Sequence, residues 1–417
     1  MRTLVLQPRF SKKDSPSART AESDFDEAVA LTRAIDLENA HAEIIPVRAI
    51  TAAMFFGKGP VERIAAILEE TTAQLVFINA ALTPVQQRNL EREWKVKVTD
   101  RQGLILEIFS ARAKTREGKL QVELAALMYQ RSRLVKAWSH LERQRGGLGK
   151  TGGPGETQKE LDRRIIDDKI KAIKKDLEQV VRNRAVQRAA RERVPFPVVA
   201  LVGYTNAGKS TLFNALTDEE VFAKDLLFAT LDTTLRALKL PSGRNVILSD
   251  TVGFISQLPA DLIAAFRATL EETVHADIIL HVRDIASENT QAERDDVVAT
   301  LGRMDLDPTT PVIEVWNKID LLANADRNDH PVGAFAVSAL TGEGLPALKQ
   351  GIDDLLASHD VERDIVLDST EGEALAWLYR HVSVLDRHDK GNQVHIRVRL
   401  SLAKLGQFNH HFMKEIA

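Results

Sequence analysis

The sequence predicts an α/β protein with several domains, and three observations support this class. The chain has 417 residues, more than one compact domain usually contains. Hydrophobic residues make up 44% and charged residues 28%, as in folded globular proteins, so a disordered or fibrous chain is excluded. Short apolar runs alternate with helix-like stretches over the first hundred residues, and apolar runs recur after residue 195, a pattern typical of parallel sheets covered by helices.

The composition also excludes several kinds of site and location. The sequence contains no cysteine, so disulfides, thiolate metal sites and cysteine nucleophiles are excluded. The longest apolar stretch, residues 196–204, is about half the ~20 residues of a membrane span. Polar and basic residues interrupt the N-terminus by Gln7 and Arg9. We therefore expect a cytoplasmic protein with neither a signal peptide nor stable membrane insertion.

Residues 1–110 are expected to form a small α/β domain. Residues 3–6, 42–47 and 75–78 are predicted strands, and residues 24–37 and 60–70 are predicted helices. This alternation predicts a parallel sheet covered by helices. No catalytic constellation is evident in this region.

Residues 111–194 are expected to form an antiparallel helical hairpin. Apolar residues recur at alternating spacings of three and four from Leu120 to Leu141 and again from Ile166 to Val180. The intervening segment, residues 146–156, contains six glycines and one proline, which end both helices. Each helix is expected to bury its apolar stripe only against the other, so that the tip projects from the globular body.

The hairpin is also the basic part of the chain. It contains 22 Lys or Arg against 11 Asp or Glu, whereas the whole chain has a formal net charge of −3. Such a block is often only a solvated helical face, and the tip could be a plain connector. Two to five residues would suffice for that purpose, however. The length of the tip, its glycines and the flanking Arg143, Arg145 and Lys150 favour a probe that approaches phosphate-rich RNA closely.

A phosphate-binding loop follows the hairpin. The apolar run 198–202 leads into Gly203-Tyr204-Thr205-Asn206-Ala207-Gly208-Lys209-Ser210, followed by Thr211, which is a complete P-loop between a predicted strand and a predicted helix. Its glycines let backbone amides converge on phosphates. Lys209 is expected to reach the β- and γ-phosphates, and the Ser210 hydroxyl to bind Mg²⁺.

Two motifs further along the chain are expected to complete the metal and γ-phosphate site. Asp250-Thr251-Val252-Gly253 follows a short apolar run at 246–248; its carboxylate can hold Mg²⁺ through water, and the Gly253 amide can contact the γ-phosphate. The second hydroxyl ligand is expected between residues 216 and 240, the switch I region. Thr230 in Phe228-Ala229-Thr230-Leu231-Asp232 is the first choice, and Thr233 and Thr234 are alternatives that spacing does not separate. The predicted catalytic residues are thus Lys209, Thr230 and Gly253, and the predicted metal ligands are Ser210 and Thr230.

Two later motifs predict that the base is guanine. In Asn317-Lys318-Ile319-Asp320, the Asp320 carboxylate would accept hydrogen bonds from the ring N1–H and the exocyclic amine, a donor pair that adenine lacks. Lys318 would pack along the base, and Asn317 would tie this loop to the P-loop. The backbone of Ser338-Ala339-Leu340 can contact the guanine O6. Because these motifs occur in order at predicted strand ends, GTP or GDP is the expected ligand.

Two residues of this site bear on the rate of hydrolysis. Phe254 stands where many regulatory GTPases place a glutamine that orients the attacking water. A phenyl ring cannot do this, so intrinsic hydrolysis is expected to be slow until a partner orders the switches. Asn206 occupies a position at which several GTPases use K⁺ in place of an arginine finger; the alternative is that Asn206 only caps the loop.

The sequence resembles the HflX family of ribosome-associated GTPases, in the Obg-like group, over almost its whole length. The resemblance is most specific in Asp100-Arg101, residues 106–109, 112–113, 120–124, 145–147, 153–158 and 162–164, and in the motifs 203–211, 228–232 and 250–254. It implies that Thr230 is the switch I magnesium ligand and that Phe254 is the usual hydrophobic replacement. It also implies that the hairpin enters the peptidyl transferase region of the large ribosomal subunit and that the protein splits stalled or idle ribosomes. Gly153 departs from the arginine often found before Gly-Pro-Gly-Glu.

The expected architecture is therefore α/β: a P-loop GTPase domain at 195–358, preceded by an N-terminal domain at 1–110 and a hairpin at 111–194, and followed by a small α/β domain at 359–417. With the resemblance, the expected function is that of a monomeric GTPase that binds the large ribosomal subunit and its rRNA through its N-terminal domains and splits or rescues ribosomes or acts in large-subunit biogenesis. Two alternatives are a GTPase coupled to RNA modification, for which no modifying site is evident, and a nucleotide-gated coiled-coil adaptor for a protein or membrane partner.

Overall fold

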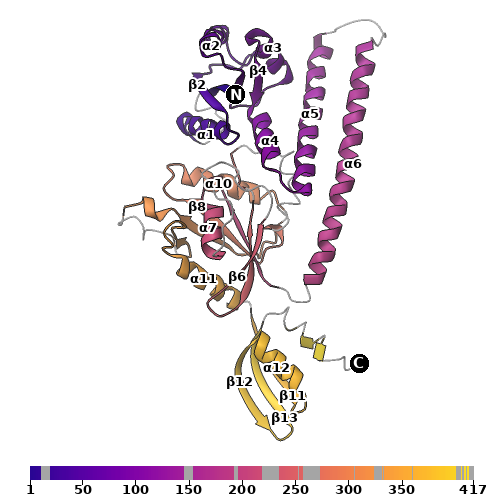
Figure 1. Ribbon diagram of the computed structural model, residues 1–417, viewed down its shortest axis with the longest axis vertical. Coiled ribbons are helices and arrows are strands. Elements are labelled where there is room, and N and C mark those ends of the chain that lie inside the picture. The colour runs from indigo at the N-terminus through magenta and orange to yellow at the C-terminus, as the bar shows by residue number, and fades with distance from the viewer. Residues whose placement is uncertain are drawn as a thin grey trace.

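The computed structural model describes most of the chain (Figure 1). The described residues are 1–10, 19–144, 154–191, 196–217, 234–251, 253–256, 273–304, 306–323, 331, 333–358, 360–400, 405, 408–409 and 411–412. Within them, no helix combines the length and the apolar character that crossing a membrane requires.

The N-terminal domain is a four-stranded parallel sheet in the order β2-β1-β3-β4. Its elements are β1 (Arg2–Arg9), α1 (Ala21–Arg33), β2 (Glu38–Pro46), α2 (Lys58–Thr71), β3 (Leu75–Ile78), α3 (Pro84–Trp94) and β4 (Lys97–Asp100). The expected parallel α/β sheet is confirmed. The fourth strand was not predicted, because Val98 is the single apolar residue in its four positions.

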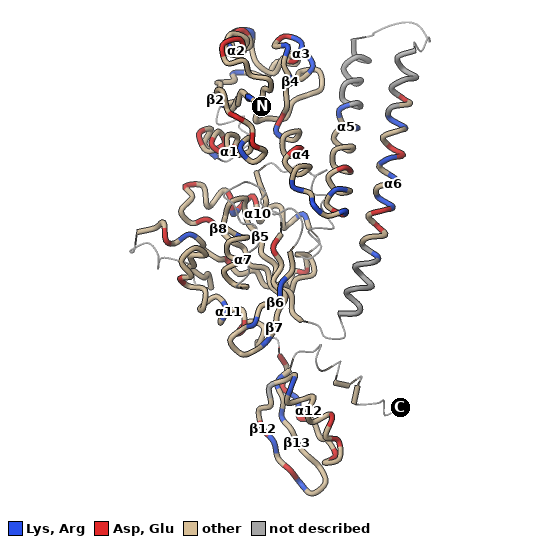
Figure 2. The backbone as a smooth tube through the Cα atoms, viewed as in Figure 1, with Lys and Arg blue, Asp and Glu red and all other residues tan. Residues whose placement is uncertain are grey.

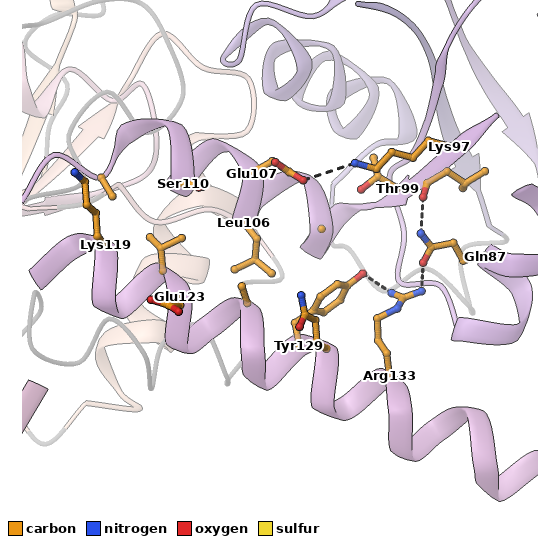
Figure 3. A pocket seen from close by; sticks show the side chains of 16 residues that line it. Gln87, Lys97, Thr99, Leu106, Glu107, Ser110, Lys119, Glu123, Tyr129 and Arg133 are labelled. Carbon is orange, nitrogen blue, oxygen red and sulfur yellow. Dashed lines mark hydrogen bonds and ion pairs between the residues drawn. The ribbon is translucent and has the colours of Figure 1, made fainter. Parts of the chain in front are cut away.

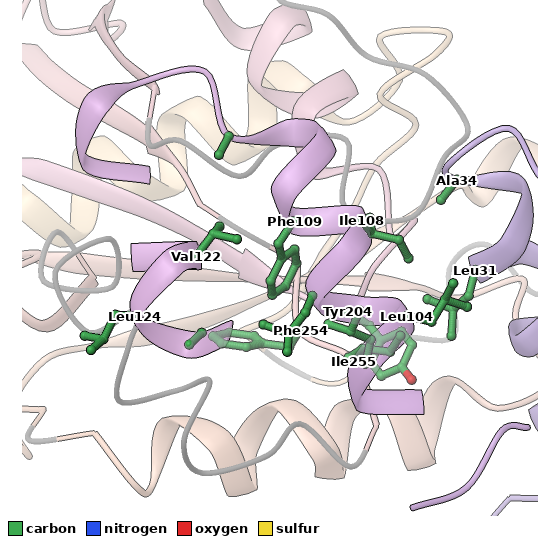
Figure 4. Packing of buried hydrophobic residues seen from close by; sticks show 14 of the residues in the cluster. Leu31, Ala34, Leu104, Ile108, Phe109, Val122, Leu124, Tyr204, Phe254 and Ile255 are labelled. Atoms are coloured by element: carbon green, nitrogen blue, oxygen red, sulfur yellow. The ribbon is translucent and has the colours of Figure 1, made fainter. Parts of the chain in front are cut away.

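Helix α4 (Arg101–Arg112) begins directly after β4. The Asp100 side chain caps it by accepting a hydrogen bond from the Gly103 amide at 2.8 Å. The helix buries Leu104, Ile105, Ile108 and Phe109, which lie in one cluster with residues of the nucleotide-binding domain (Figure 4). The two domains therefore share a core.

Two long helices, α5 (Arg116–Gln144) and α6 (Pro154–Arg191), lie side by side and antiparallel (Figure 1). Ile170 and Ile173 of α6 are buried, and Arg131 of α5 lies 2.8 Å from Asp167 of α6 in an ion pair. Lysines and arginines alternate with acidic residues along α6 (Figure 2). The predicted hairpin helices are thus present, while the glycine-rich tip lies mostly outside the described residues.

The hairpin packs on the N-terminal domain through a face that was not predicted. We expected each helix to bury its apolar stripe only against the other, whereas α5 also packs on α3 and α4: the Tyr129 hydroxyl donates to Asp100 at 2.8 Å, and Arg133 donates to Asp100 at 3.1 Å. The reason is that α5 has a second row, Val122, Ala125 and Tyr129, on the helix face opposite Leu120, Leu124 and Leu127. The base of the hairpin is therefore fixed to the N-terminal domain.

The nucleotide-binding domain is a six-stranded sheet in the order β10-β9-β8-β5-β7-β6, parallel except for the β6–β7 pair. Its described elements are β5 (Val198–Gly203), α7 (Lys209–Thr217), β6 (Thr234–Lys239), β7 (Asn245–Asp250), β8 (Ile278–Asp284), α10 (Thr290–Leu301), β9 (Val312–Asn317), the short helix η1 (Ile319–Leu321), β10 (Phe335–Ala336) and α11 (Leu345–Ser358). The carboxyl ends of β5, β7 and β9 bring the predicted motifs to one edge of the sheet.

The C-terminal part is a small antiparallel sheet with one helix. Its elements are β11 (Val361–Asp368), α12 (Gly372–His381), β12 (Ser383–Lys390) and β13 (Gln393–Leu400), with strand order β11-β13-β12. Leu378 of α12 is buried in one cluster with Ile396 and Val398 of β13. The expected α/β class of this region is confirmed.

Candidate nucleotide site

The backbone of the P-loop requires its two glycines. A Cβ at Gly203 would lie 2.2 Å from the Val282 carbonyl oxygen, and a Cβ at Gly208 would lie 2.3 Å from Nδ2 of Asn317. Gly208 also has a φ of +87°, in the left-handed region. Asn206 is exposed with a φ of 61°. A larger residue at 203 would collide with the backbone of β8, and one at 208 would displace the Asn317 side chain.

Lys209 is folded back on the loop that it follows. Its side chain is only 6% exposed, and Nζ donates to the carbonyl oxygens of Gly203 at 3.1 Å and Tyr204 at 2.8 Å. Burial lowers the pKa of Lys209 to about 8, an effect that Asp250 partly offsets. The ammonium group is thus buried at the loop, and two carbonyl oxygens and Asp250 offset the cost of burying its charge only in part. An anionic ligand at this position would stabilise the charge further.

Ser210 and Asp250 meet at the start of α7. The Ser210 hydroxyl donates to Oδ2 of Asp250 at 2.8 Å. Hydroxyl and carboxylate oxygens are the ligands that Mg²⁺ prefers. A hydroxyl oxygen and a carboxylate oxygen from residues 40 positions apart in the sequence therefore lie next to each other, so both could face a metal ion bound beside the phosphates.

The residues after Asp250 run along the P-loop. The Phe254 amide donates to the Gly203 carbonyl at 3.0 Å, and the Thr205 amide donates to the Phe254 carbonyl at 2.7 Å. Gly253 lies so close to the loop that a Cβ would be 3.0 Å from Nζ of Lys209. The Gly253 backbone is therefore at the lip of the phosphate-binding loop.

The Phe254 side chain points away from this lip. It is 1% exposed and belongs to the cluster shared with Leu104 and Phe109 of α4 (Figure 4). The position thus has a packing role, and its side chain is directed at the N-terminal domain rather than at a bound phosphate.

A single side chain joins the remaining motifs. Nδ2 of Asn317 donates to the Ala207 carbonyl at 2.9 Å, and its Oδ1 accepts from the Ala339 amide at 3.0 Å. Lys318 has a φ of 68°, and its Nζ lies 2.8 Å from Oδ2 of Asp284. The loops that begin at Asn317 and at Ser338 are therefore joined to the P-loop by hydrogen bonds of one side chain.

The predicted residues fall into two groups. Those brought together at the sheet edge are Gly203 to Thr211, Asp250, Thr251, Gly253, Asn317 to Asp320, Ser338 and Ala339; Leu340 follows them with 80% exposure. The predictions on Phe228, Ala229, Thr230, Leu231, Asp232, Thr233 and Val252 lie outside the described residues.

The sequence reasoning missed several residues near the site. Asp284 ends β8, and this strand-end position could have suggested it. Glu27, in the first helix of the chain, accepts a hydrogen bond from the Tyr204 hydroxyl. No local pattern signals a contact across 177 positions.

A hollow of about 530 Å³ lies between β4, α4 and α5, away from the P-loop residues (Figure 3). Its lining contains charges of both signs, including Lys97, Glu107, Lys119 and Glu123, and none of the predicted site residues. At one end Arg133 donates to Gln87 and to the Tyr129 hydroxyl.

The fold and this site define the class of protein. A parallel sheet with a P-loop after β5, an aspartate-glycine motif after β7 and an asparagine-lysine-aspartate motif after β9 is the arrangement of a P-loop GTPase.

Comparisons with known proteins give the family. Residues 22–110 match the family model "GTP-binding GTPase N-terminal", 112–191 "GTP-binding GTPase Middle Region", 198–318 "50S ribosome-binding GTPase" and 322–412 "HflX C-terminal domain". GTPase HflX of Magnetococcus marinus is 46% identical over 92% of this chain and 89% of its own length. GTPase HflX of Escherichia coli is 43% identical over 84% of this chain and 83% of its own length. Among solved structures, the SsGBP–GDP complex is 24% identical over 85% of this chain and 98% of its own, with a TM-score of 0.49. The chain belongs to the HflX family of GTPases.

Proposed function

We propose that this GTPase binds the large ribosomal subunit through its N-terminal domains and hydrolyses GTP to split or rescue stalled or idle ribosomes, or acts in large-subunit biogenesis. The observation that carries the nucleotide part is the Asn317 side chain, which links the P-loop to both base-recognition loops. The ribosomal part is supported by the description of the matched model, a 50S ribosome-binding GTPase, and by the basic hairpin. We further propose that the protein is monomeric and cytoplasmic.

In the proposed mechanism, Lys209 exchanges two carbonyl partners for the β- and γ-phosphates. This exchange is favourable because the ammonium group is already buried, and phosphate oxygens compensate its charge better than carbonyl dipoles do. The Gly253 amide would donate to the γ-phosphate. Ser210 and Thr230 would hold Mg²⁺ directly and Asp250 through water, and the ion, when bound, supplies neutralisation of phosphate charge.

Phe254 is buried and cannot orient the attacking water, so we propose that hydrolysis relies on positioning and on positive charge near the phosphates. Asn206 is exposed at the rim of the loop, and we propose that it helps to bind K⁺ there. The alternative is that Asn206 only shapes the loop through its left-handed backbone. Hydrolysis rates in KCl and in NaCl at equal ionic strength separate the two, since only the first requires K⁺.

The first experiment is steady-state GTP hydrolysis by the full chain in KCl, with and without purified large ribosomal subunits. We expect a large stimulation of hydrolysis, because a partner that orders the switches would position the attacking water, which the Phe254 side chain cannot do. Stimulation should disappear when residues 146–156 are replaced by a short linker, while GDP affinity stays the same. Normal GTP binding without stimulation would overturn the ribosomal role.

The main alternative is a nucleotide-gated adaptor that uses the hairpin to bind a protein or membrane. Two helices that pack side by side are compatible with it. The salt dependence of hairpin binding distinguishes the two functions. Phosphate contacts weaken steeply with salt, whereas an apolar protein interface does not.

A further inference from the structure

A buried polar cluster connects the N-terminal domain to the nucleotide site. At its centre is Glu27 of α1, which is 8% exposed. Its carboxylate accepts hydrogen bonds from Arg101 of α4, from the Tyr204 hydroxyl of the P-loop, and from Arg19 at 2.7 Å. One carboxylate thus joins three separate segments of the chain.

Residues of this cluster form hydrogen bonds with Ser256, three residues after Gly253. The Ser256 amide donates to the Tyr204 hydroxyl at 2.7 Å. Arg101 donates to the Ser256 carbonyl at 3.1 Å and to its hydroxyl oxygen at 2.9 Å. The main-chain donor and acceptor of Ser256 are therefore both bonded to side chains that Glu27 holds.

The charges fix the direction of these hydrogen bonds. Burial raises the pKa of the Glu27 carboxyl, but Arg101, Arg19 and the Tyr204 hydroxyl together outweigh burial and hold that pKa below its usual value. Burial and the neighbouring Glu27 raise the pKa of Tyr204 well above its usual value. Glu27 is thus an anion at neutral pH, and Tyr204 keeps the proton that it donates.

The segment 253–256 is consequently anchored at two points. The main chain of Phe254 is hydrogen-bonded to the main chain of Gly203 and Thr205 in the P-loop. The main chain of Ser256 is hydrogen-bonded to the side chains of Tyr204 and Arg101. Gly253 begins this anchored segment, beside Lys209. Fixing a short segment in advance removes the entropy cost of ordering it when a ligand binds.

We infer that Glu27 is a positioning residue of the nucleotide site: through Tyr204 and Arg101 it holds Ser256, and so holds the Gly253 amide ready for a γ-phosphate. The inference rests on the proposed role of Gly253. It gives the N-terminal domain a specific task, which is to favour GTP over GDP, because GDP has no γ-phosphate for Gly253 to contact.

The test is Tyr204→Phe, which removes the hydroxyl and keeps the ring. The matched control is Tyr129→Phe. That tyrosine also donates to a buried carboxylate, Asp100, at 2.8 Å, and Arg133 lies over its ring at 4.8 Å, much as Arg19 lies over Tyr204 at 4.5 Å. The hydrogen bonds of the Tyr129 hydroxyl are to Asp100 and Arg133, which belong to the N-terminal domain and the hairpin.

The measurement is the affinity of the full chain for GDP and for a non-hydrolysable GTP analogue, with Mg²⁺. We expect Tyr204→Phe to weaken the analogue by roughly three- to tenfold, the effect of one lost hydrogen bond, and to leave GDP within about twofold. Tyr129→Phe should leave both affinities within about twofold. Equal losses of GDP and analogue, or no loss of either, would overturn the inference.

A third variant separates failure of this inference from failure of the proposed function. Gly253→Ala should weaken the analogue selectively; if it does not, the proposed role of Gly253 is wrong. If it does while Tyr204→Phe has no effect, the positioning role of Glu27 is wrong. Should Tyr204→Phe not fold, Ser256→Ala removes one acceptor of Arg101, and a selective loss of about twofold is expected; no selective loss would count against the inference.

Discussion

At the scale of single residues, we expect the choice of base to depend on one carboxylate. Asp320 lies in η1, directly after the loop that Asn317 ties to the P-loop. We expect Asp320→Asn to weaken GTP at least tenfold, because a charge-assisted hydrogen bond contributes about 1.5–3 kcal/mol. The same variant should gain affinity for xanthosine triphosphate, whose ring offers an oxygen where guanine has an amine. Competition binding with both nucleotides measures this, and unchanged GTP affinity would contradict the assignment.

Lys209 makes the nucleotide-free protein less stable at neutral pH. Because burial lowers its pKa from the usual 10.5 to about 8, the folded state binds fewer protons than the unfolded state between these values. The free energy of unfolding therefore rises with pH across this window and falls as pH drops through 8. Lys209→Met should stabilise the nucleotide-free chain at pH 7 by about 1–3 kcal/mol, with no gain left above about pH 10.5. Thermal unfolding against pH without nucleotide is the measurement; a loss of stability at pH 7 would refute the explanation.

At the scale of elements, α6 carries the exposed charge that RNA would contact. Lys171 and Lys175 are exposed and one turn apart on this helix. Replacing both by glutamine should weaken binding to large ribosomal subunits and lower the slope of log affinity against log salt by about one to two, since each phosphate contact contributes about 0.7–0.9. Lys58→Gln with Lys239→Gln is the control, because these two exposed lysines lie outside the hairpin. Equal slopes for both double variants would contradict RNA contact by this face of α6.

Local patterns predicted the elements whose burial leaves a mark in the sequence. β5 is buried through most of its length, and it is preceded and followed by clear signals, proline and the P-loop. β8 is buried as well, but it was not predicted. β12 was missed because Ser383–Lys390 is mostly exposed and polar, as an edge strand with one solvated face can be. The second row of α5 was missed because the three-four spacing draws attention to one helix face only.

The candidate site divides in the same way. Ser210, Asp250 and Asn317 could be placed from sequence, because each belongs to a motif whose neighbours fix its position at a strand end. Glu27, Arg101 and Ser256 could not, since their contacts join the first helix to segments up to 229 positions away. Arg101 belongs to a motif that carries the family resemblance, but nothing in the neighbouring residues indicates that it reaches Ser256.

At the scale of the whole molecule, the buried Phe254 tests whether the two domains share one core. Phe254→Gln introduces the residue that many regulatory GTPases use, yet we expect no faster intrinsic hydrolysis, because this side chain packs among Leu104 and Phe109. The variant should instead lose about 3 kcal/mol of unfolding free energy through the lost packing and the buried amide. Hydrolysis rates and denaturant unfolding measure both. Phe109→Gln, in the same cluster, is the control and should lose similar stability; faster hydrolysis by Phe254→Gln would show that position 254 reaches the attacking water.

The shared core also has a consequence during synthesis of the chain. About 145 residues separate Phe109 of α4 from Phe254, so the N-terminal domain leaves the ribosome well before its partner surface exists. At a synthesis rate of about 5–20 residues per second, part of α4 remains uncovered on the order of ten seconds before Phe254 and Ile255 are made. During that interval Arg101 and Glu27 can already pair with each other, Tyr204 is added to the chain before Phe254, and Ser256, which completes their cluster, is made only after it. In a nascent chain paused before residue 254, the apolar residues of α4 that pack against Phe254 and Ile255 therefore stay exposed to solvent. We expect such a paused chain to be prone to aggregation until elongation resumes.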